Sequence, residues 1–209
     1  MLHVWPSTLL LLTLCCGIGQ AELKSSHNDT PLQSRQRSGT RRDPWKISKL
    51  ITDLSLSETV RTDLVVKYGY TNVVSDSMVT PEMAVATPQV KAKMPVKCMA
   101  PFALVMVDAD APSPYKPTAR SRLHWLVVNS NSSEMLHEGD EVVPYEAPNP
   151  AKGTGPHRFV FLAYCQFDKR LDSSSIMPKK RDNFNLASFA KGLGTGKPFA
   201  GSFFYSFNR

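Results

Sequence analysis

The sequence has no run of apolar residues long enough to cross a lipid bilayer. The longest run, Leu9–Cys16, contains eight residues, whereas a membrane-spanning helix needs about 20. A transmembrane anchor is therefore the weaker interpretation of this segment. Small residues and Gly19–Ala21 follow the run, which is typical of the hydrophobic region and cleavage site of a secretory signal peptide. We predict a signal peptide over residues 1–21, a mature chain beginning at Glu22 and a secreted, extracellular protein.

Signatures of several catalytic and nucleic-acid-binding sites are also missing. The chain has neither the H-E-x-x-H nor the G-x-S-x-G motif, and its Cys and His residues do not follow zinc-finger spacing. The formal net charge of +7 belongs wholly to the mature chain, because residues 1–21 contain no Asp, Glu, Lys or Arg. This excess attracts anionic partners in general, but no recognition motif organises it. We therefore expect no enzyme activity, no cofactor and no nucleic-acid partner.

Apolar periodicity is lacking between the predicted signal peptide and the domain that follows. The segment Lys24–Arg42 is polar and basic, and such a segment cannot bury enough apolar surface to offset the entropy that ordering costs. We predict a flexible basic leader over residues 22–42. The sequons that begin at Asn28 and Asn131 predict N-linked glycans at both positions in a secreted chain.

The remaining residues, 43–209, have the length and apolar content of one domain. Helical signals are sparse in this region, and strands and helices do not alternate as they do in βαβ units. One helix is predicted to begin at the capping acid Asp43 and to continue through Leu54. A second helix is predicted over residues 182–191, ending before Gly192.

Runs of β-branched and aromatic residues predict the strands. They cover residues 63–68, 72–74, 90–94, 102–108, 123–129, 157–166 and 199–207. The last strand is rich in aromatic residues, and we expect one set to pack inward while the other meets solvent or a neighbour. A short helical turn is expected after Thr80, which would cap it. The predicted fold class is mainly β (α+β): a β-sandwich or large antiparallel sheet with a few short peripheral helices.

Two of the predicted strands are joined by a polar loop that carries acids and a histidine. Asp108 and Asp110 stand at the end of the first strand, where continued extended geometry would point both carboxylates to one side. Three prolines in the loop exclude regular strand pairing, and His124 opens the returning strand. Acids at strand ends are usually turn formers and a lone histidine is usually structural, but a second cluster of the same design favours a binding site.

The second cluster is a Pro/Gly-rich loop that delivers His157 onto the first residue of another apolar strand. The glycines of Lys152–Gly155 would let backbone N–H groups approach a phosphate oxygen closely. His124 and His157 add donors, and Asp108 or Asp110 can orient a histidine or accept from an ammonium group. This set of groups suits a zwitterion or an anion.

Three motifs follow one another in these two regions. They are D-x-D-A-P-S at 108–113, H-x-L-V-V-N at 124–129 and P-x-K-G-T-G-x-H-R-F at 150–159. Together they resemble the phosphatidylethanolamine-binding protein family, and the resemblance extends from about Asp43 to Phe207. It implies a β-sandwich with a large central antiparallel sheet and a ligand pocket at one end of that sheet. The resemblance assigns this pocket to Asp108, Asp110, Ala111, Pro112, His124, Gly155 and His157, with Trp125 and Phe159 near the rim.

The site chemistry and the resemblance predict a secreted domain that binds phosphate-bearing anions such as phospholipid headgroups, without catalysis. Arg158 is expected to brace the site through a salt bridge to an acid. An extracellular protease inhibitor or signalling protein with a protein partner is the alternative use of the same fold. A metal-dependent hydrolase is less favoured: the two acids and two histidines could hold a divalent metal, but no nucleophile motif accompanies them.

Cysteine is scarce outside the predicted signal peptide, where only Cys98 and Cys165 remain. An even pair in a secreted chain favours one disulfide. Two separate buried thiols are the alternative, because a sequence gives no distances. The two cysteines lie at similar distances from Asp108 and His157, on strands expected to be antiparallel, and this spacing favours the disulfide.

Overall fold

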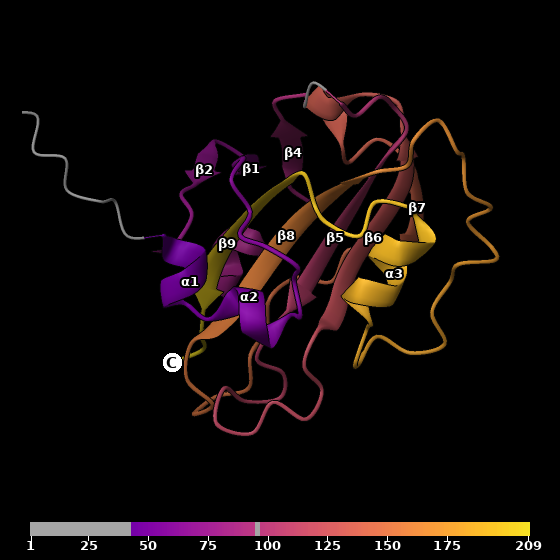
Figure 1. The fold of residues 1–209 in the computed structure, drawn as a ribbon. Helices are drawn as coiled ribbons and strands as arrows, with labels where there is room; N and C mark the ends of the chain where they lie inside the picture. The colour runs from indigo at the N-terminus through magenta and orange to yellow at the C-terminus, as the bar shows by residue number, and fades with distance from the viewer. Residues whose placement is uncertain (1–42, 95–96) are drawn as a thin grey trace, which may run out of the picture. The chain divides into compact units, whose positions relative to one another are not determined.

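The structure, a computed structural model, describes residues 43–94 and 97–209. The predicted signal peptide, the predicted leader and Asn28 lie outside the described residues. Two β-sheets and a few short helices make up the described part (Figure 1). This confirms the prediction of a mainly β fold with a large central sheet and peripheral helices.

The larger sheet has six strands in the order β3-β9-β8-β5-β6-β7, and the smaller sheet has three in the order β2-β1-β4. Neighbouring strands are antiparallel, except that β3 runs parallel to β9. The bounds are β1 (Leu64–Tyr68), β2 (Thr71–Val73), β3 (Ser77–Met78), β4 (Gln89–Ala92), β5 (Phe102–Asp108), β6 (Arg122–Ser130), β7 (Asp140–Val143), β8 (His157–Cys165) and β9 (Ala200–Ser206). All the predicted strands are present, and the short edge strands β3 and β7 are additional to them.

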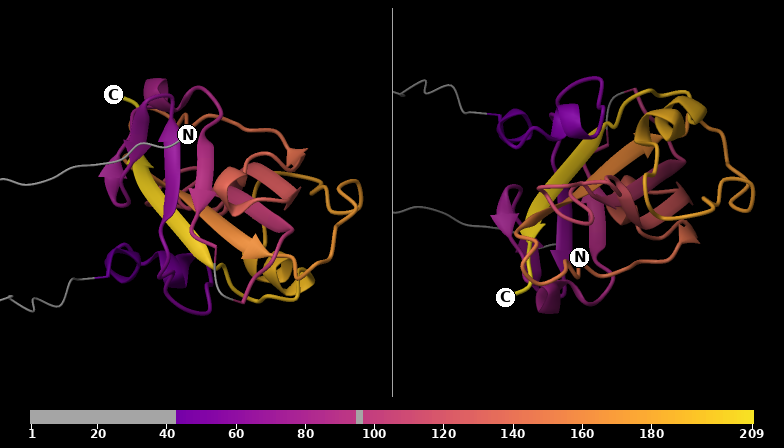
Figure 2. Two further views of the ribbon diagram at one scale, coloured as in Figure 1. Left: turned by 90° about the horizontal axis from the view of Figure 1, so that it is seen from above. Right: turned by 90° about the horizontal axis from the view of Figure 1, so that it is seen from below.

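The large sheet is the middle one of three layers (Figure 2). The small sheet packs on one face, and the other face is covered by α1 (Pro44–Ile47), α2 (Leu50–Asp53) and α3 (Leu186–Gly192). Every residue of β5 is buried as a result. A strand covered on both faces needs apolar residues at successive positions, which explains the uninterrupted apolar run of β5.

The prediction of one helix through Leu54 is wrong. Two four-residue helices, α1 and α2, occupy this segment. Lys49, the residue between them that precedes α2, has a φ of 58°, so the left-handed backbone there breaks the helical path. Asp43 does cap α1, because its carboxylate accepts the backbone N–H of Trp45.

The other two helical predictions are right in place but wrong in detail. α3 begins at Leu186, where the side chain of Asn185 accepts the backbone N–H of Ser188, and it includes Gly192. The turn after Thr80 is a 3-10 helix, η1 (Pro81–Ala84), and the side chain of Thr80 makes no capping hydrogen bond. A second 3-10 turn, η2 (Ser133–Met135), follows β6.

Both faces of the aromatic strand β9 are covered, and Tyr205 stays half-buried, so the expected outward set meets a neighbouring layer more than solvent. Phe203 packs against Trp45 of α1 with 5.3 Å between ring centroids, and Phe204 stacks on Phe159 at 5.6 Å on the opposite face. Both phenylalanines are fully buried. A side chain at Gly201 would place its Cβ 2.9 Å from the Trp45 ring, so glycine is needed for this close packing.

The predicted disulfide is present. Cys98 and Cys165 are bonded, with a Cα–Cα distance of 5.7 Å. Asn131 of the second sequon is exposed at the end of β6, where it is open to the predicted glycosylation. Among the helices that the structure describes, none has both the length and the apolar character to span a bilayer.

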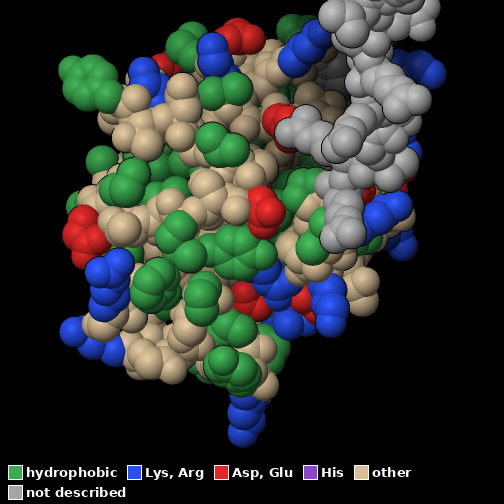
Figure 3. Space-filling model, turned by 90° about the vertical axis from the view of Figure 1, so that its left-hand side faces the viewer, with side chains coloured by type: hydrophobic (Ala, Val, Ile, Leu, Met, Phe, Trp, Pro, Cys, Tyr) green, Lys and Arg blue, Asp and Glu red, His purple; other side chains and the backbone are tan. Residues whose placement is uncertain are grey.

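Large hydrophobic side chains are exposed at several places on the domain. Figure 3 shows hydrophobic side chains interspersed with acidic and basic ones on the face seen from the left-hand side of Figure 1. The most exposed members of this set are Tyr70, Val74, Val85, Met99 and Tyr115. Scattered exposure of this kind is normal for a folded domain.

Candidate functional site

A small cavity lies where three central strands end. Asp108, the last residue of β5, pairs with Arg122 of β6 on one side and with Phe159 of β8 on the other. The cavity has a volume of about 210 Å³. It is lined by Asp108, Ala111, Pro112, Arg122, His124, Glu146, Asn149, Pro150, Ala151, His157 and Phe159. Six of the predicted site residues are therefore brought together at one end of the sheet.

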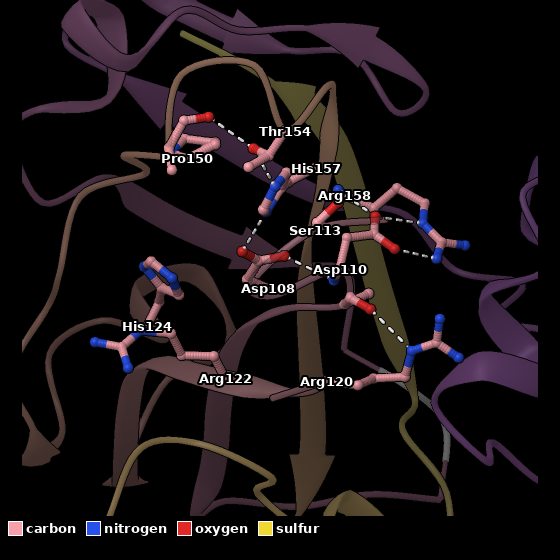
Figure 4. Close-up of polar contacts among 12 residues, drawn as sticks. Asp108, Asp110, Ser113, Arg120, Arg122, His124, Pro150, Thr154, His157 and Arg158 are labelled. Carbon is pink, nitrogen blue, oxygen red and sulfur yellow. Dashed lines mark hydrogen bonds and ion pairs between the residues drawn. The ribbon is translucent and has the colours of Figure 1, made fainter. Parts of the chain in front are cut away.

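One wall of the cavity is formed by the pair Asp108 and His157. Oδ2 of Asp108 lies 2.8 Å from Nδ1 of His157, and both side chains are almost fully buried (Figure 4). The other ring nitrogen of His157, Nε2, lies 3.0 Å from the hydroxyl oxygen of Thr154. Both nitrogens of this imidazole are thus engaged within the protein.

Asp110 does not share this wall, which corrects the prediction that both carboxylates point to one side. The strand ends at Asp108, whose Oδ1 accepts the backbone N–H of Asp110 at 2.7 Å and turns the chain there. Strand alternation therefore does not continue to Asp110. Its carboxylate instead accepts the backbone N–H and two side-chain N–H groups of Arg158.

Arg158 braces the site, as predicted. Besides Asp110, its guanidinium forms an ion pair with Asp53 of α2 at 2.8 Å and donates to the carbonyl of Ser48. Burial acts to lower the pKa of Arg158, but its hydrogen bonds and ion pairs with Asp110 and Asp53 outweigh burial and raise that pKa above its ordinary value. This cation is therefore committed to structure and ties the loop after β5 to the helical layer.

Arg120 extends the same network and was not recognised in the sequence. Its guanidinium donates to Asp53 at 2.7 Å and to the carbonyl of Ala109 at 3.0 Å. Asp53 therefore bridges Arg120, near the end of the loop between β5 and β6, and Arg158 of β8, which holds Asp110 near the start of that loop. The network fixes the position of Ala111 and Pro112 in the cavity wall.

His124 forms the opposite wall, and a bulge in β6 places it there. Met106 pairs with Trp125 and Val107 with Leu123, so His124 is an extra residue without a partner in β5. An extra residue of this kind bends a strand and redirects a side chain. Figure 4 shows His124 across the cavity from Asp108.

The environment of His124 favours its neutral form. Nδ1 lies 2.7 Å from the carbonyl oxygen of Glu146, to which it donates, and the ring meets that of Phe159 edge to face at 5.1 Å. Burial lowers the pKa of His124, and the hydrogen bond to Glu146 and the charge of Asp108 oppose this shift without cancelling it. Nε2 has no partner among the described residues, so it is the ring nitrogen open to a ligand.

Arg122 and Glu146 also line the cavity but are absent from the predicted site. The guanidinium of Arg122 donates to the Glu146 carboxylate at 3.1 Å and to Asp182 at 2.6 Å. Arg181 reaches the same carboxylate at 3.3 Å and donates to the carbonyl of His124. Arg122 stands two residues before His124, so strand alternation was the signal that could have indicated it.

The remaining predicted residues divide into two groups. Ala111 and Pro112 line the cavity, and Phe159 forms part of its lining while being fully buried, below the rim rather than on it. Trp125 is not at the rim: it is buried in the core and its indole N–H donates to Glu141 at 2.8 Å. It pairs with Met106 in the interior of the sheet, and that register determines its burial.

Gly155 also lies outside the cavity lining, which corrects the role predicted for the loop Lys152–Gly155. Gly155 has a φ of 87° and is needed for the turn, where a side chain would point toward Tyr115. The preceding residues Asn149, Pro150 and Ala151 face the cavity instead. Asn208 donates to the side-chain oxygen of Asn149 at 2.8 Å, which leaves the Asn149 amide N–H groups as donors.

The cavity can accept an anion or a zwitterion. Arg122, protonated His124 and Asn149 supply donors, and Asp108 and Glu146 supply carboxylates. No group of three or more His, Cys, Asp or Glu side chains in the described ranges is arranged to hold a metal ion. The arrangement provides polar groups for recognition in a small cavity.

Comparisons with known proteins agree with the fold. A model of the family described as phosphatidylethanolamine-binding protein matches residues 57–204. The chain is 31% identical over 158 residues to Protein MOTHER of FT and TFL1 homolog 2 of Oryza sativa subsp. japonica, covering 76% of this chain and 88% of that protein. It is 33% identical to Protein FLOWERING LOCUS T of Arabidopsis thaliana over 78% of this chain and 90% of that protein.

A solved structure, that of carboxypeptidase Y inhibitor complexed with the cognate proteinase, superposes with a TM-score of 0.68 at 26% identity. The match covers 80% of this chain and 94% of the inhibitor. The family match covers most of the domain, including the strands that end at the cavity. The chain therefore belongs to the phosphatidylethanolamine-binding protein family.

Proposed function

We propose that this chain binds a phosphate-bearing anion, such as a phospholipid headgroup, in the cavity at the end of β5, β6 and β8, without catalysing a reaction. The proposal rests on the hydrogen bonding of the two ring nitrogens of His124. Its Nδ1 is held by the carbonyl of Glu146, while its Nε2 has no partner among the described residues. Protonation of this nitrogen would supply a charge-assisted hydrogen bond to an anion.

Other donors around the cavity support the same proposal. The Arg122 guanidinium supplies permanent charge, and the amide N–H groups of Asn149, whose oxygen is held by Asn208, have no partner among the described residues. The backbone N–H groups of Ala111 and Ala151 have no partner among the described residues, and both residues line the cavity. A phosphate group has enough acceptor oxygens to satisfy several of these donors together.

The volume of the cavity limits the size of the ligand. At about 210 Å³, the cavity is smaller than the roughly 300–1,000 Å³ of pockets that enclose drug-sized ligands. A phosphate with a short substituent fits a cavity of this volume. The acyl chains of a phospholipid would have to stay outside. Asp108 and Glu146 would then face the ammonium end of a zwitterionic headgroup.

We also propose that the protein is secreted. The Cys98–Cys165 disulfide supports this, since structural disulfides form and persist in oxidising compartments. The predicted signal peptide and sequons agree with that compartment. N-terminal sequencing and glycan analysis of protein expressed in a secretory host test the proposal, and an intact Met1 on the main form would contradict it.

Protease inhibition is the second candidate function. It is supported by the likeness to carboxypeptidase Y inhibitor, which was solved with its proteinase. A panel of extracellular proteases, including carboxypeptidases, assayed with and without this protein, would test it. Binding of a soluble headgroup should leave any such inhibition unchanged if the inhibitory surface lies away from the cavity.

Calorimetric titration with O-phosphoethanolamine, inorganic phosphate and ethanolamine tests the main proposal. We expect O-phosphoethanolamine and phosphate to bind to one site and ethanolamine alone to bind far more weakly. Native mass spectrometry of the secreted protein would reveal a co-purified phospholipid or small phosphate. Equal binding of ethanolamine and O-phosphoethanolamine would contradict phosphate recognition.

A further inference from the structure

Thr154, which the proposed ligand site does not include, contacts the imidazole of His157. Its hydroxyl oxygen lies 2.7 Å from the carbonyl oxygen of Ala151 and 3.0 Å from Nε2 of His157 (Figure 4). A carbonyl oxygen can only accept, so Thr154 donates its single hydrogen to Ala151. Toward His157 the hydroxyl oxygen is then an acceptor, and Nε2 must carry a hydrogen.

A second hydrogen lies on the other side of the imidazole, between Nδ1 of His157 and Asp108. Nδ1 of His157 lies 2.8 Å from Oδ2 of Asp108, and a hydrogen bond at this distance requires one hydrogen between the two atoms. With Nε2 also protonated, the pair exists either as imidazolium with carboxylate or as imidazole with carboxylic acid. The net charge of the pair is zero in both forms.

We propose that Thr154 is a positioning residue that keeps the Asp108–His157 pair protonated and therefore electrically neutral beside the cavity. Without the Thr154 hydroxyl as acceptor, an N–H at Nε2 would be buried and unsatisfied, which costs free energy of folding. The pair would release a proton and keep the neutral imidazole with Nδ1–H toward an ionised Asp108. The net charge of the Asp108–His157 pair would then be −1, next to the proposed site of the anion.

The charged groups around the Asp108–His157 pair would not neutralise a net charge of −1 on it. Across the cavity, Arg122 is already paired with Glu146, and burial lowers the pKa of His124. Behind Asp108, Asp110 is neutralised by Arg158. A negative charge at Asp108 would therefore act on a bound anion with little local compensation.

The inference rests on the proposed binding of an anion, but its first test does not. In nitrogen-15 NMR spectra at pH 8, His157 of the wild-type protein should show a protonated Nε2. Thr154→Val should lose this hydrogen and show a bare Nε2, and Thr154→Ser should restore it. A protonated Nε2 in Thr154→Val would overturn the role of Thr154 whether or not the cavity binds anions.

The second test measures sulfate binding, because the charge of sulfate stays constant between pH 5.5 and 8. We expect Thr154→Val to weaken sulfate binding about tenfold at pH 8, as repulsion by one unit charge across a small site predicts. Thr154→Ser should bind sulfate like the wild type.

Thr118→Val is the matched control, since Thr118 is exposed in the loop between β5 and β6 and makes no side-chain hydrogen bond to a described residue. It should leave sulfate binding unchanged at pH 8. Equal sulfate affinity of Thr154→Val and wild type at pH 8 would overturn the electrostatic role. Failure of the wild type to bind sulfate or phosphate would instead reject the proposed function, and the NMR test would still decide the role of Thr154.

Discussion

His124 and Phe159 meet edge to face across the floor of the cavity, with 5.1 Å between ring centroids and an interplanar angle of 88°. The aromatic ring gives the imidazole an apolar neighbour, which is part of the burial that lowers the pKa of His124. His124 therefore has one nitrogen held by a backbone carbonyl and one that gains a proton at the cost of desolvation. An anion in the cavity would offset that cost.

Replacement of His124 should weaken anion binding more than any change of comparable size outside the cavity. His124→Ala removes the only ring nitrogen in the described cavity that has no protein partner, and loss of a charge-assisted hydrogen bond costs about 1–3 kcal/mol of binding free energy. Titration with O-phosphoethanolamine measures the effect. His137→Ala is the control, because His137 lies away from this cavity beside Val90.

His157→Ala should also weaken binding, but by a different route. Both nitrogens of His157 are engaged by Asp108 and Thr154, so this variant removes the hydrogen-bond partner of Asp108 Oδ2 in the cavity wall and also lowers stability. Normal anion binding by both histidine variants would show that the cluster is a structural network and would reject the binding proposal.

Stability should depend on pH through His124 in a definite direction. The unfolded chain binds a proton at this residue near its ordinary pKa of 6.5, whereas the folded protein binds it only at lower pH. Between these pKa values the unfolded chain holds more protons, so the free energy of unfolding falls as the pH drops below 6.5. Urea unfolding of wild type and His124→Gln between pH 5 and 7.5 should show a shallower decline in the variant. A slope unchanged by the substitution would contradict a lowered pKa at His124.

The strands could be predicted from the sequence because they depend on local composition, whereas Ala111, Pro112 and Phe159 of the cavity were assigned by the family resemblance. Continuous apolar runs indicated β5 and β8, whose two faces are both covered. His124 and Asp108 could be recognised as polar residues at strand ends. The position of His124 in a bulge could not, since a bulge depends on the register with β5.

The errors have equally specific causes. Asp110 was expected beside Asp108, but the hydrogen bond from its own N–H to Asp108 ends the alternation. Glu146 and Asp53 reach the site from distant parts of the chain, and nothing in their local sequence indicates this. Trp125 was assigned to the rim from a resemblance, whereas its pairing with Met106 buries it.

Removal of Arg158 should be strongly destabilising. Asp110 is 2% exposed, and Arg158→Met would leave its carboxylate buried without a cation. Loss of one partner from a buried ion pair costs about 3–5 kcal/mol of unfolding free energy. Chemical denaturation measures the change.

Lys197→Met is the control, because the ion pair of Lys197 with Glu58 is solvent-exposed and its loss should have little effect. Similar stabilities of the two variants would contradict the bracing role of Arg158.

The disulfide should contribute to stability through the loop that it closes. Cys98 and Cys165 are separated by 67 positions, and a closed loop of this length reduces the entropy of the unfolded chain by an amount worth about 2–4 kcal/mol. Cys98→Ser/Cys165→Ser should lower the free energy of unfolding by this amount at neutral pH. Labelling of both thiols in the native, unreduced protein would contradict the bond.

Ser206 offers the opposite kind of test, because its removal should not destabilise the protein. It is fully buried, lies directly across from His157 in the β8–β9 pairing, and its hydroxyl has no hydrogen-bond partner among the described residues. An unsatisfied buried hydroxyl opposes folding, so Ser206→Ala should raise the free energy of unfolding by about 1 kcal/mol. Ser202→Ala is the matched control on the same strand: Ser202 is equally buried, but its hydroxyl pairs with that of Ser75 at 3.0 Å, and its loss should destabilise. If Ser206→Ala is as destabilising as Ser202→Ala, the hydroxyl has a partner such as a buried water, and high-resolution crystallography of the wild type would locate it beside His157.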